Sequence, residues 1–294
     1  MKCFYHNDLD GRCAAWAVHA WVGIYPNADG ALRGDFIEIN YNKPFPFEII
    51  QPDEQVWIVD YSISPDEMKR LLKITDNVTW IDHHQTAIDK YADFPHEIRG
   101  VRQSGEAGCM LTFKYIHWYT ARGEGPIDLS ASNPGILIPE HVMLVEDWDL
   151  WKFRFGDRTR EFNAGMSMED TSPESDIWWK MTGCSKELDQ VISNGKVALK
   201  YRAQWAKEFM KSWSFPVEFE GHKCIAANLG HCNSSYFDSI DDGYDILMPF
   251  IFDGKKWTVS LYSKTVDVSQ IAKKYGGGGH KGASGFQCER LPWD

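Results

Sequence analysis

Three short apolar segments in the first third of the chain each end in acidic or histidine side chains. They lead into His6-Asn7-Asp8-Leu9-Asp10-Gly11, into Asp60 and into Asp82-His83-His84. β-Branched and aromatic residues that stop at a polar break are typical of buried strands and the loops that leave them. In open α/β sheets, ligands bind beyond the carboxyl ends of the strands. We therefore expect three strands to bring these side chains to one place.

A further pair of acids, Asp147 and Asp149, lies in the Trp-flanked stretch Val145-Glu146-Asp147-Trp148-Asp149-Leu150-Trp151. Acids beside bulky apolar side chains are partly desolvated and need a partner. One of the two is therefore expected to be a ligand. We favour Asp147 and keep Asp149 as the alternate.

This set of side chains predicts a site for divalent cations. Carboxylates with a few histidines suit Mn²⁺, or Mg²⁺, better than a structural zinc site, which prefers thiolates. Five or six acids at one place would repel one another without cations, and one ion cannot use so many ligands, so we predict two ions. His6 and Asp8 would complete one site, and Asp60 would bridge to the other. The expected ligands are His6, Asp8, Asp10, Asp60, His83 and Asp147.

The chemistry that such a site favours is phosphoryl transfer. Two divalent ions roughly 3.5–4 Å apart can activate a water and stabilise an in-line displacement at phosphorus. Asp60, Asp82 and His84 form the predicted catalytic set, in which His84 also contacts substrate and Asp82 orients a histidine. The alternative, a purely structural cation site, rarely needs so many acids.

A second functional segment is the glycine run Gly276–Gly279, which His280 and Lys281 follow. Glycine runs are commonly flexible linkers, and that alternative stays open. We favour an anion-binding loop, because glycine lets backbone N–H groups approach an anion closely and cationic side chains lie beside it. The expected substrate-binding residues are Gly277, Gly278, Gly279, His280 and His84.

The elements that position these residues have an α/β order. Strands are expected at residues 2–5, 35–40, 56–59 and 78–81, and helices at 12–22, 66–74, 104–120 and 139–151. Ser64-Pro65-Asp66-Glu67 is a capping box before the second helix. Strand–helix–strand order predicts a parallel sheet.

The remaining residues predict a second, smaller α/β domain. A loop is expected at residues 123–135 and a long helix from about residue 187 to 213. Strands should follow at 215–219, 224–229, 246–252 and 257–262, with a hairpin turn at Asp253-Gly254 and a helix at 267–275. The predicted division is a catalytic domain at 1–160, a linker with a connecting helix at 161–213 and a substrate-binding domain at 214–294.

Composition limits the classes of function. The 294 residues are 43% hydrophobic and 25% charged, as in a globular protein. The net charge of −11 argues against a broad surface for long duplex nucleic acid. The seven scattered cysteines lack a Cys-x-x-Cys pair, which indicates a reducing compartment. The first residues lack an apolar signal core, and no apolar run is long enough to cross a membrane. We expect a soluble cytoplasmic protein without a membrane partner, and leave a homodimer open.

Together, these motifs resemble the DHH phosphoesterase superfamily with its DHH-associated C-terminal domain. Asp82-His83-His84 matches the motif that names the superfamily, His6–Gly11 resembles the first motif, Asp60 the second and Asp147 the fourth. Gly276–His280, with Ala283 and Gly285, resembles the signature of the C-terminal domain. The resemblance covers nearly the whole chain.

The resemblance implies a two-domain enzyme with two Mn²⁺ ions in the N-terminal domain and a catalytic cleft between the domains. It also implies that the glycine loop holds the phosphate or nucleotide end of the substrate. Ser260-Leu261-Tyr262-Ser263 departs from the Arg-bearing version of several branches, so a terminal-phosphate contact there is not carried over. The chain is most similar to the nanoRNase-like, exopolyphosphatase-related branch.

The predicted activity is therefore a Mn²⁺-dependent phosphodiesterase that releases mononucleotides from very short single-stranded RNA or linear dinucleotides. The alternatives within the same class are an exopolyphosphatase and a cyclic-dinucleotide phosphodiesterase. An alternative of another class is a catalytically silent nucleotide-binding sensor. The presence of every motif acid argues against that alternative.

Overall fold

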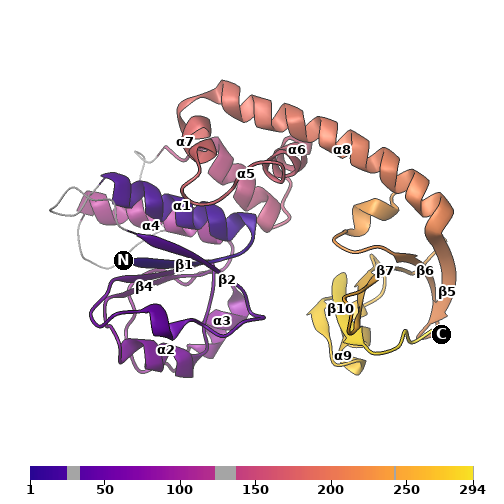
Figure 1. Ribbon diagram of the computed structural model, residues 1–294, viewed down its shortest axis with the longest axis horizontal. Coiled ribbons are helices and arrows are strands. Elements are labelled where there is room, and N and C mark those ends of the chain that lie inside the picture. The colour runs from indigo at the N-terminus through magenta and orange to yellow at the C-terminus, as the bar shows by residue number, and fades with distance from the viewer. Residues whose placement is uncertain (25–33, 123–136, 242, 294) are drawn as a thin grey trace. The chain divides into compact units, whose positions relative to one another are not determined.

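The computed structural model describes residues 1–24, 34–122, 137–241 and 243–293 (Figure 1). They form two compact units, Met1–Val197 and Ala198–Asp294. The division falls within the long helix α8 (Ser185–Trp213), so residues 161–197 belong to the first unit. This differs from the predicted boundaries at residues 160 and 213. The loop predicted at 123–135 lies outside the described residues.

The first unit is built on a four-stranded parallel sheet in the order β2-β1-β3-β4. Its strands are β1 (Lys2–His6), β2 (Asp35–Ile39), β3 (Val56–Val59) and β4 (Val78–Ile81). Every residue of β3 and β4 is buried, which explains why these strands are apolar except for Thr79, because a parallel sheet is covered on both faces. The predicted α/β class with a parallel N-terminal sheet is confirmed.

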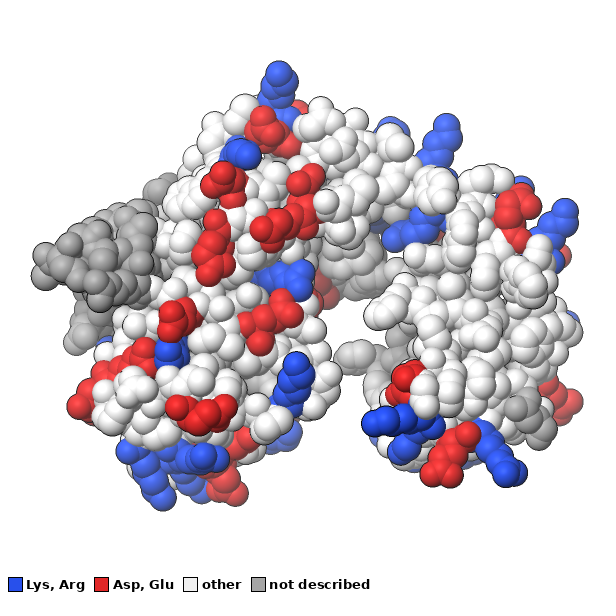
Figure 2. All heavy atoms as spheres, viewed as in Figure 1, with Lys and Arg blue, Asp and Glu red and all other residues white. Residues whose placement is uncertain are grey.

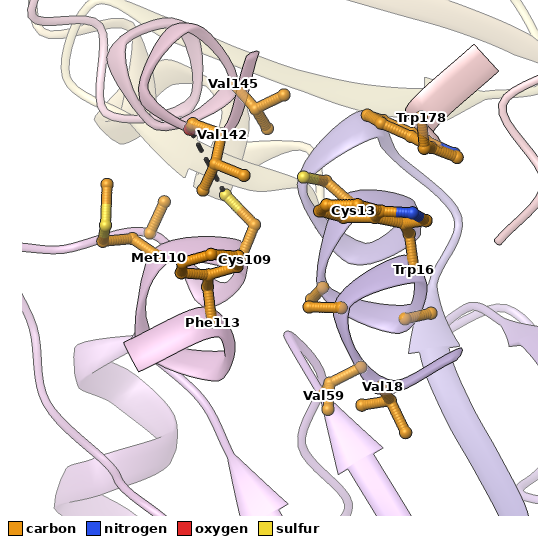
Figure 3. Close-up of a cluster of buried hydrophobic side chains, with 14 of the residues drawn as sticks. Cys13, Trp16, Val18, Val59, Cys109, Met110, Phe113, Val142, Val145 and Trp178 are labelled. Carbon is orange, nitrogen blue, oxygen red and sulfur yellow. Dashed lines mark hydrogen bonds between the residues drawn. The ribbon is translucent and has the colours of Figure 1, made fainter. Parts of the chain in front are cut away.

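Helices cover both faces of this sheet, and side chains alternate between the faces along each strand. Trp57 and Val59 join the core under α1, α4 and α5, whereas Val56 and Ile58 join the core under α2 and α3. Figure 3 shows the first of these cores, where Trp16 of α1 stacks on Trp178 of α7. The helices of the first unit are α1 (Leu9–Ile24), α2 (Pro65–Leu72), α3 (Gln85–Lys90), α4 (Gly108–Arg122), α5 (Glu140–Asp149), α6 (Asp157–Met166) and α7 (Asp176–Gly183), with a 3₁₀ turn at Phe47–Ile49.

The predicted capping box at the start of α2 is confirmed. The Ser64 hydroxyl accepts a hydrogen bond from the Glu67 backbone N–H at 3.3 Å, and the Glu67 carboxylate accepts one from the Ser64 N–H at 2.8 Å. Two backbone donors at the helix start are therefore satisfied by side chains. This helix returns the chain from β3 to β4.

The second unit contains a six-stranded sheet in the order β5-β6-β7-β8-β10-β9. Strands β6 and β7 pair in parallel and the other neighbours are antiparallel. The predicted turn at Asp253-Gly254 joins β7 to β8, with Gly254 at φ 95°. The elements are β5 (Ser214–Phe219), β6 (His222–Asn228), a 3₁₀ turn (Ser234–Phe237), β7 (Ile246–Phe252), β8 (Trp257–Tyr262), α9 (Val268–Lys274), β9 (Gly278–His280) and β10 (Ala283–Cys288).

The glycine run forms a strand where a loop was predicted. Gly278–His280 is β9, which pairs with β10 at the edge of the sheet. A Cβ atom on Gly277 would lie 2.1 Å from the carbonyl oxygen of Gly285, and one on Gly279 would lie 2.6 Å from Ser284 Cα. These glycines are therefore required for close approach of the backbones.

On the face shown in Figure 2, acidic and basic side chains of the described residues are interspersed and form no broad basic surface. This agrees with the net charge of −11. Among the helices that the structure describes, none combines the length and the apolar character that crossing a bilayer requires.

Candidate metal centre

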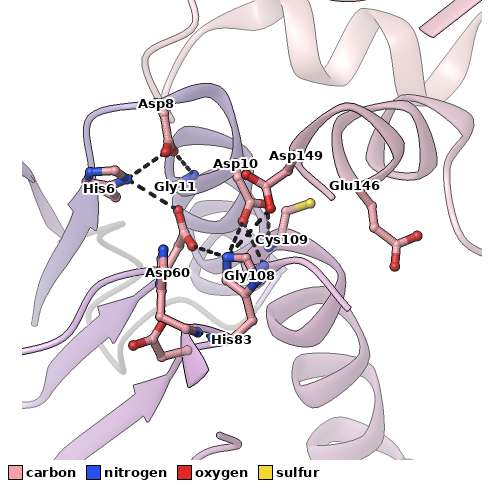
Figure 4. Close-up of polar contacts among 12 residues, drawn as sticks. His6, Asp8, Asp10, Gly11, Asp60, His83, Gly108, Cys109, Glu146 and Asp149 are labelled. Carbon is pink, nitrogen blue, oxygen red and sulfur yellow. Dashed lines mark hydrogen bonds and ion pairs between the residues drawn. The ribbon is translucent and has the colours of Figure 1, made fainter. Parts of the chain in front are cut away.

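Acidic and histidine side chains meet at the carboxyl edge of the parallel sheet (Figure 4). His6 is the last residue of β1, Asp60 directly follows β3, and His83 lies just beyond β4. Helix α5 adds Asp149 at its carboxyl end. We call the set of His6, Asp8, Asp10, Asp60, His83 and Asp149 the acid–histidine cluster.

Asp60 lies between two groups of possible ligand atoms. On one side, His6 Nδ1 is 2.6 Å from Asp8 Oδ2 and 3.8 Å from Asp60 Oδ2. On the other side, His83 Nε2 is 3.2 Å from Asp60 Oδ1. The same nitrogen lies 3.7 Å from Asp10 and 3.6 Å from Asp149. Each group is compact enough to hold one cation, and Asp60 has one oxygen facing each of them.

The Asp60 carboxylate is buried and accepts no hydrogen bond from the described residues. Its exposure is 1%, and neither of its oxygens has a hydrogen-bond partner among the described residues. Its backbone is in the left-handed region at φ 52°, a conformation that is unusual for a residue with a side chain and that clusters at functional sites. A buried carboxylate without hydrogen-bond donors needs a compensating charge, and a divalent cation supplies one.

Two acids of the cluster, Asp60 and Asp149, have a raised affinity for protons. Burial, followed by the charges of Asp10 and Asp8, raises the pKa of Asp60 well above its ordinary value. The same causes raise the pKa of Asp149 to about 8. Bound cations would relieve the repulsion between the ionised carboxylates, so this set of donor atoms fits divalent metal ions.

Asp10 is held by the start of helix α4. Its carboxylate accepts hydrogen bonds from the backbone N–H groups of Gly108 at 2.7 Å and Cys109 at 2.9 Å. Free N–H groups and the positive end of the helix dipole make a helix N-terminus a favourable place for an anion. A Cβ atom on Gly108 would lie 2.6 Å from Asp60 Cβ, so only glycine leaves room for Asp60 here.

Asp82 positions the two histidines that follow it. It is fully buried, and its Oδ1 accepts hydrogen bonds from the backbone N–H groups of His83 at 2.8 Å and His84 at 3.3 Å. The same oxygen lies 2.7 Å from His84 Nδ1, and this hydrogen bond is the main cause that raises the pKa of His84. Burial lowers the pKa of His83, which favours the neutral imidazole that binds metals. Asp82 therefore orients this segment through its carboxylate.

The sequence favours Asp147 as the metal ligand and Asp149 as the alternate, but in the structure it is Asp149 that lies in the cluster. Asp147 is fully buried, and its carboxylate accepts hydrogen bonds from Thr159 Oγ1 at 2.5 Å and from the backbone N–H groups of Arg154 at 2.9 Å and Phe155 at 3.3 Å. Two residues along a helix correspond to about 200° of rotation, so the two acids face opposite ways. Asp149 lies in the cluster, while Asp147 holds the turn after α5.

The remaining predicted substrate residues lie in the second unit. Gly277 precedes β9, and Gly278, Gly279 and His280 form it. His280 is exposed. Gly108, by contrast, has a role in the cluster that no pattern in the sequence indicates, because its neighbour Asp60 lies far earlier in the chain.

Comparison with known proteins gives a distant relative of undescribed activity. No protein-family model matches the chain. The uncharacterized protein R106 of Acanthamoeba polyphaga mimivirus is 23% identical over 247 residues, which is 80% of this chain. The chain spans about half of that relative's length, 53%.

Solved structures of other proteins share this fold. The pGpG-specific phosphodiesterase PggH from Vibrio cholerae is similar with a TM-score of 0.51 and 11% identity, over 98% of this chain and 93% of that one. The DHH domain of a member of a ribosomal protein family is similar with a TM-score of 0.57 and 12% identity, over 97% and 81% of the two chains. The chain therefore shares its fold with these proteins, one of which is a DHH domain.

Proposed function

We propose that the protein is a metal-dependent phosphoesterase, and specifically a Mn²⁺-dependent phosphodiesterase that hydrolyses very short single-stranded RNA or linear dinucleotides to mononucleotides. The observation that carries this proposal is the buried Asp60 carboxylate, which accepts no hydrogen bond from the described residues and lies between two groups of possible ligand atoms. The fold shared with PggH, a phosphodiesterase specific for the linear dinucleotide pGpG, supports it.

Two divalent cations are the proposed cofactors. His6, Asp8 and Asp60 would hold one, and Asp10, His83 and Asp149 would hold the other, with Asp60 shared. When bound, such ions lower the pKa of a water molecule and neutralise charge on a phosphate. Mn²⁺ is favoured over Mg²⁺ by the two histidines, while the carboxylates suit either ion.

His84 is the proposed proton-carrying residue. Its Nδ1 is engaged by Asp82, so Nε2 is the nitrogen that can reach a substrate. The raised pKa of His84 lets the ring keep its second proton to a higher pH than an ordinary histidine, and a protonated ring can donate to a phosphate oxygen or to the leaving oxygen. Asp82 acts through His84 as a positioning residue.

The glycine strand of the second unit is proposed to bind the far end of the substrate. Gly278–His280 is an edge strand, so one of its sides presents backbone groups that β10 does not use. Backbone N–H groups without side chains can approach a phosphate closely. Gly277, Gly278, Gly279 and His280 are therefore the proposed contacts.

A turnover assay with Mn²⁺ titration tests the proposal. The substrates are RNA dimers to pentamers, cyclic dinucleotides, 3′-phosphoadenosine phosphate and polyphosphate. We expect mononucleotide release from the short RNAs, a loss of at least about 100-fold in Asp60→Asn, and a weaker loss confined to KM in His280→Ala. Asp66→Asn is the matched control, because that acid is exposed on α2 with 92% of its side chain accessible.

The other outcomes separate the alternatives. Cleavage of polyphosphate or of cyclic dinucleotides alone would retain the metal chemistry and reject the proposed substrate. Two bound metal ions without turnover of any substrate would reject the enzyme and favour a nucleotide-binding sensor. An Asp60→Asn variant with full activity would contradict the role of the cluster.

A further inference from the structure

A pair of tyrosines lies at the same edge of the sheet as the acid–histidine cluster. Tyr41 follows β2, whose last residue Ile39 pairs with His6, and Tyr61 directly follows Asp60. The two tyrosine rings stack with centroids 4.3 Å apart and an angle of 21° between their planes. The Tyr41 ring centroid is 5.7 Å from that of His6. An aromatic ring therefore borders the candidate metal centre.

The Tyr41 ring is held in place and still accessible. Its inner neighbour Tyr61 is 5% exposed, whereas Tyr41 is 57% exposed. The backbone N–H of Ser62 donates a hydrogen bond to the Tyr41 hydroxyl at 3.4 Å, and the side chain of Asn40 accepts one from the Tyr41 N–H at 2.7 Å. Stacking on Tyr61 covers one face of the ring, and more than half of the surface of Tyr41 stays accessible.

We propose that Tyr41 is the stacking platform for the base of a nucleotide whose phosphate lies at the acid–histidine cluster. The inference rests on the proposed function and deepens it by naming a residue that selects nucleotides. Aromatic rings stack on any base, because every base has a π face, so this contact tolerates different sequences. A ring whose orientation is already fixed loses little conformational entropy on binding.

A structural role for Tyr41 makes a different prediction. Single exposed aromatic residues are common on protein surfaces, and Tyr41 also shields Tyr61 from water. If shielding were its only role, removal of the ring would lower stability without affecting any preference for a base. A stacking platform instead distinguishes a nucleotide from the same sugar phosphate without its base. The binding of polyphosphate, which has no base, should not depend on Tyr41.

Calorimetric titration of the full chain with Mn²⁺ tests the platform, with adenosine 5′-monophosphate and ribose 5-phosphate as probes. We expect the wild type to bind the nucleotide about 10-fold more tightly than the sugar phosphate. Tyr41→Ala and Tyr41→Leu should bring the ratio to about 1, whereas Tyr41→Phe should keep it because the ring remains. Thermal unfolding of each variant reports separately on the fold.

Tyr201→Ala is the matched control, because Tyr201 is another exposed tyrosine, on helix α8, at 72%. It should leave the ratio unchanged. The proposal is overturned if the wild type binds neither probe, if it shows no preference for the nucleotide, or if Tyr41→Ala keeps that preference. Turnover of diadenylate by the same samples decides the proposed function independently. A base preference without turnover rejects the hydrolysis and retains the platform.

Discussion

Asp147 and Asp149 lie two positions apart at the end of helix α5, and their carboxylates have different surroundings. Asp149 faces other acids of the cluster, while Asp147 accepts hydrogen bonds from three residues of the following turn and helix. A carboxylate that lacks donors and faces like charges destabilises the metal-free fold. One that is surrounded by donors stabilises it.

Substitution by asparagine should therefore have opposite effects on the stability of the metal-free protein at these two positions. We expect Asp149→Asn to weaken Mn²⁺ binding by at least about 10-fold and to raise the melting temperature of the metal-free protein, because one repelling charge is removed. Asp147→Asn should cost about 1–3 kcal/mol of folding free energy, because the amide cannot accept all the hydrogen bonds of the carboxylate. Metal titration and thermal unfolding measure the two effects. Equal Mn²⁺ affinities of the two variants would contradict the assignment.

At the scale of elements, the start of helix α4 fixes two acids of the cluster at once. Its first N–H groups bind Asp10, and the missing side chain of Gly108 leaves space for Asp60. The helix must therefore begin with a glycine, because its first residue lies in close contact with Asp60 in the loop that follows β3. The position of these ligands depends on a close contact between two backbone segments.

Alanine at position 108 should disrupt this contact. Alanine is a better helix former than glycine, but its Cβ atom would clash with Asp60, so we expect Mn²⁺ affinity to fall by at least about 10-fold. Gly183→Ala is the control, because Gly183 ends helix α7 with no atom of the described chain within 4 Å of the added Cβ. That variant should bind Mn²⁺ as the wild type does. Unchanged binding by Gly108→Ala would remove Gly108 from the site.

Local patterns in the sequence were sufficient for most elements and failed where distant contacts decide. The apolar runs predicted β7 and β8 with the observed bounds, because strands that pack on a core need apolar side chains. Helix α4 begins at Gly108 and not at residue 104, because the acceptors for its first N–H groups come from Asp10 in the distant first turn of α1. The glycine run became β9 through pairing with β10. Both acids of α5 fitted the ligand pattern, and only packing distinguishes them.

At the scale of the whole molecule, the buried His141 and the half-buried Asp149 give the metal-free protein opposite responses to pH. Burial lowers the pKa of His141 from 6.5 to about 3, and neither ring nitrogen has a partner among the described residues. The unfolded chain therefore binds more protons between these values, and stability falls as the pH drops through them. Asp149 shows the reverse, with a pKa raised from 3.8 to about 8. Its native state binds more protons, so stability falls as the pH rises toward 8.

Thermal unfolding from pH 4 to pH 9 should reveal both responses. Without metal, we expect the melting temperature to fall between about pH 6.5 and 8, where the Asp149 effect is no longer opposed by His141. Asp149→Asn or added Mn²⁺ should flatten that decline, because each removes the repulsion. His141→Leu should reduce the loss of stability below pH 6 at little cost, because the replaced ring makes no hydrogen bond with the described chain. A metal-free melting temperature that rises from pH 6.5 to 8 would contradict the Asp149 assignment.

The acid–histidine cluster draws its members from His6 to Asp149, one from nearly the start of the chain and one from about its midpoint. During synthesis, every residue up to Asp149 must leave the ribosome before the last carboxylate of the cluster is available. Until then the emerging chain carries several acids that the strands have not yet gathered. The proposed cation binding would therefore be complete only after the first unit has assembled, so a nascent protein would acquire its metal after folding.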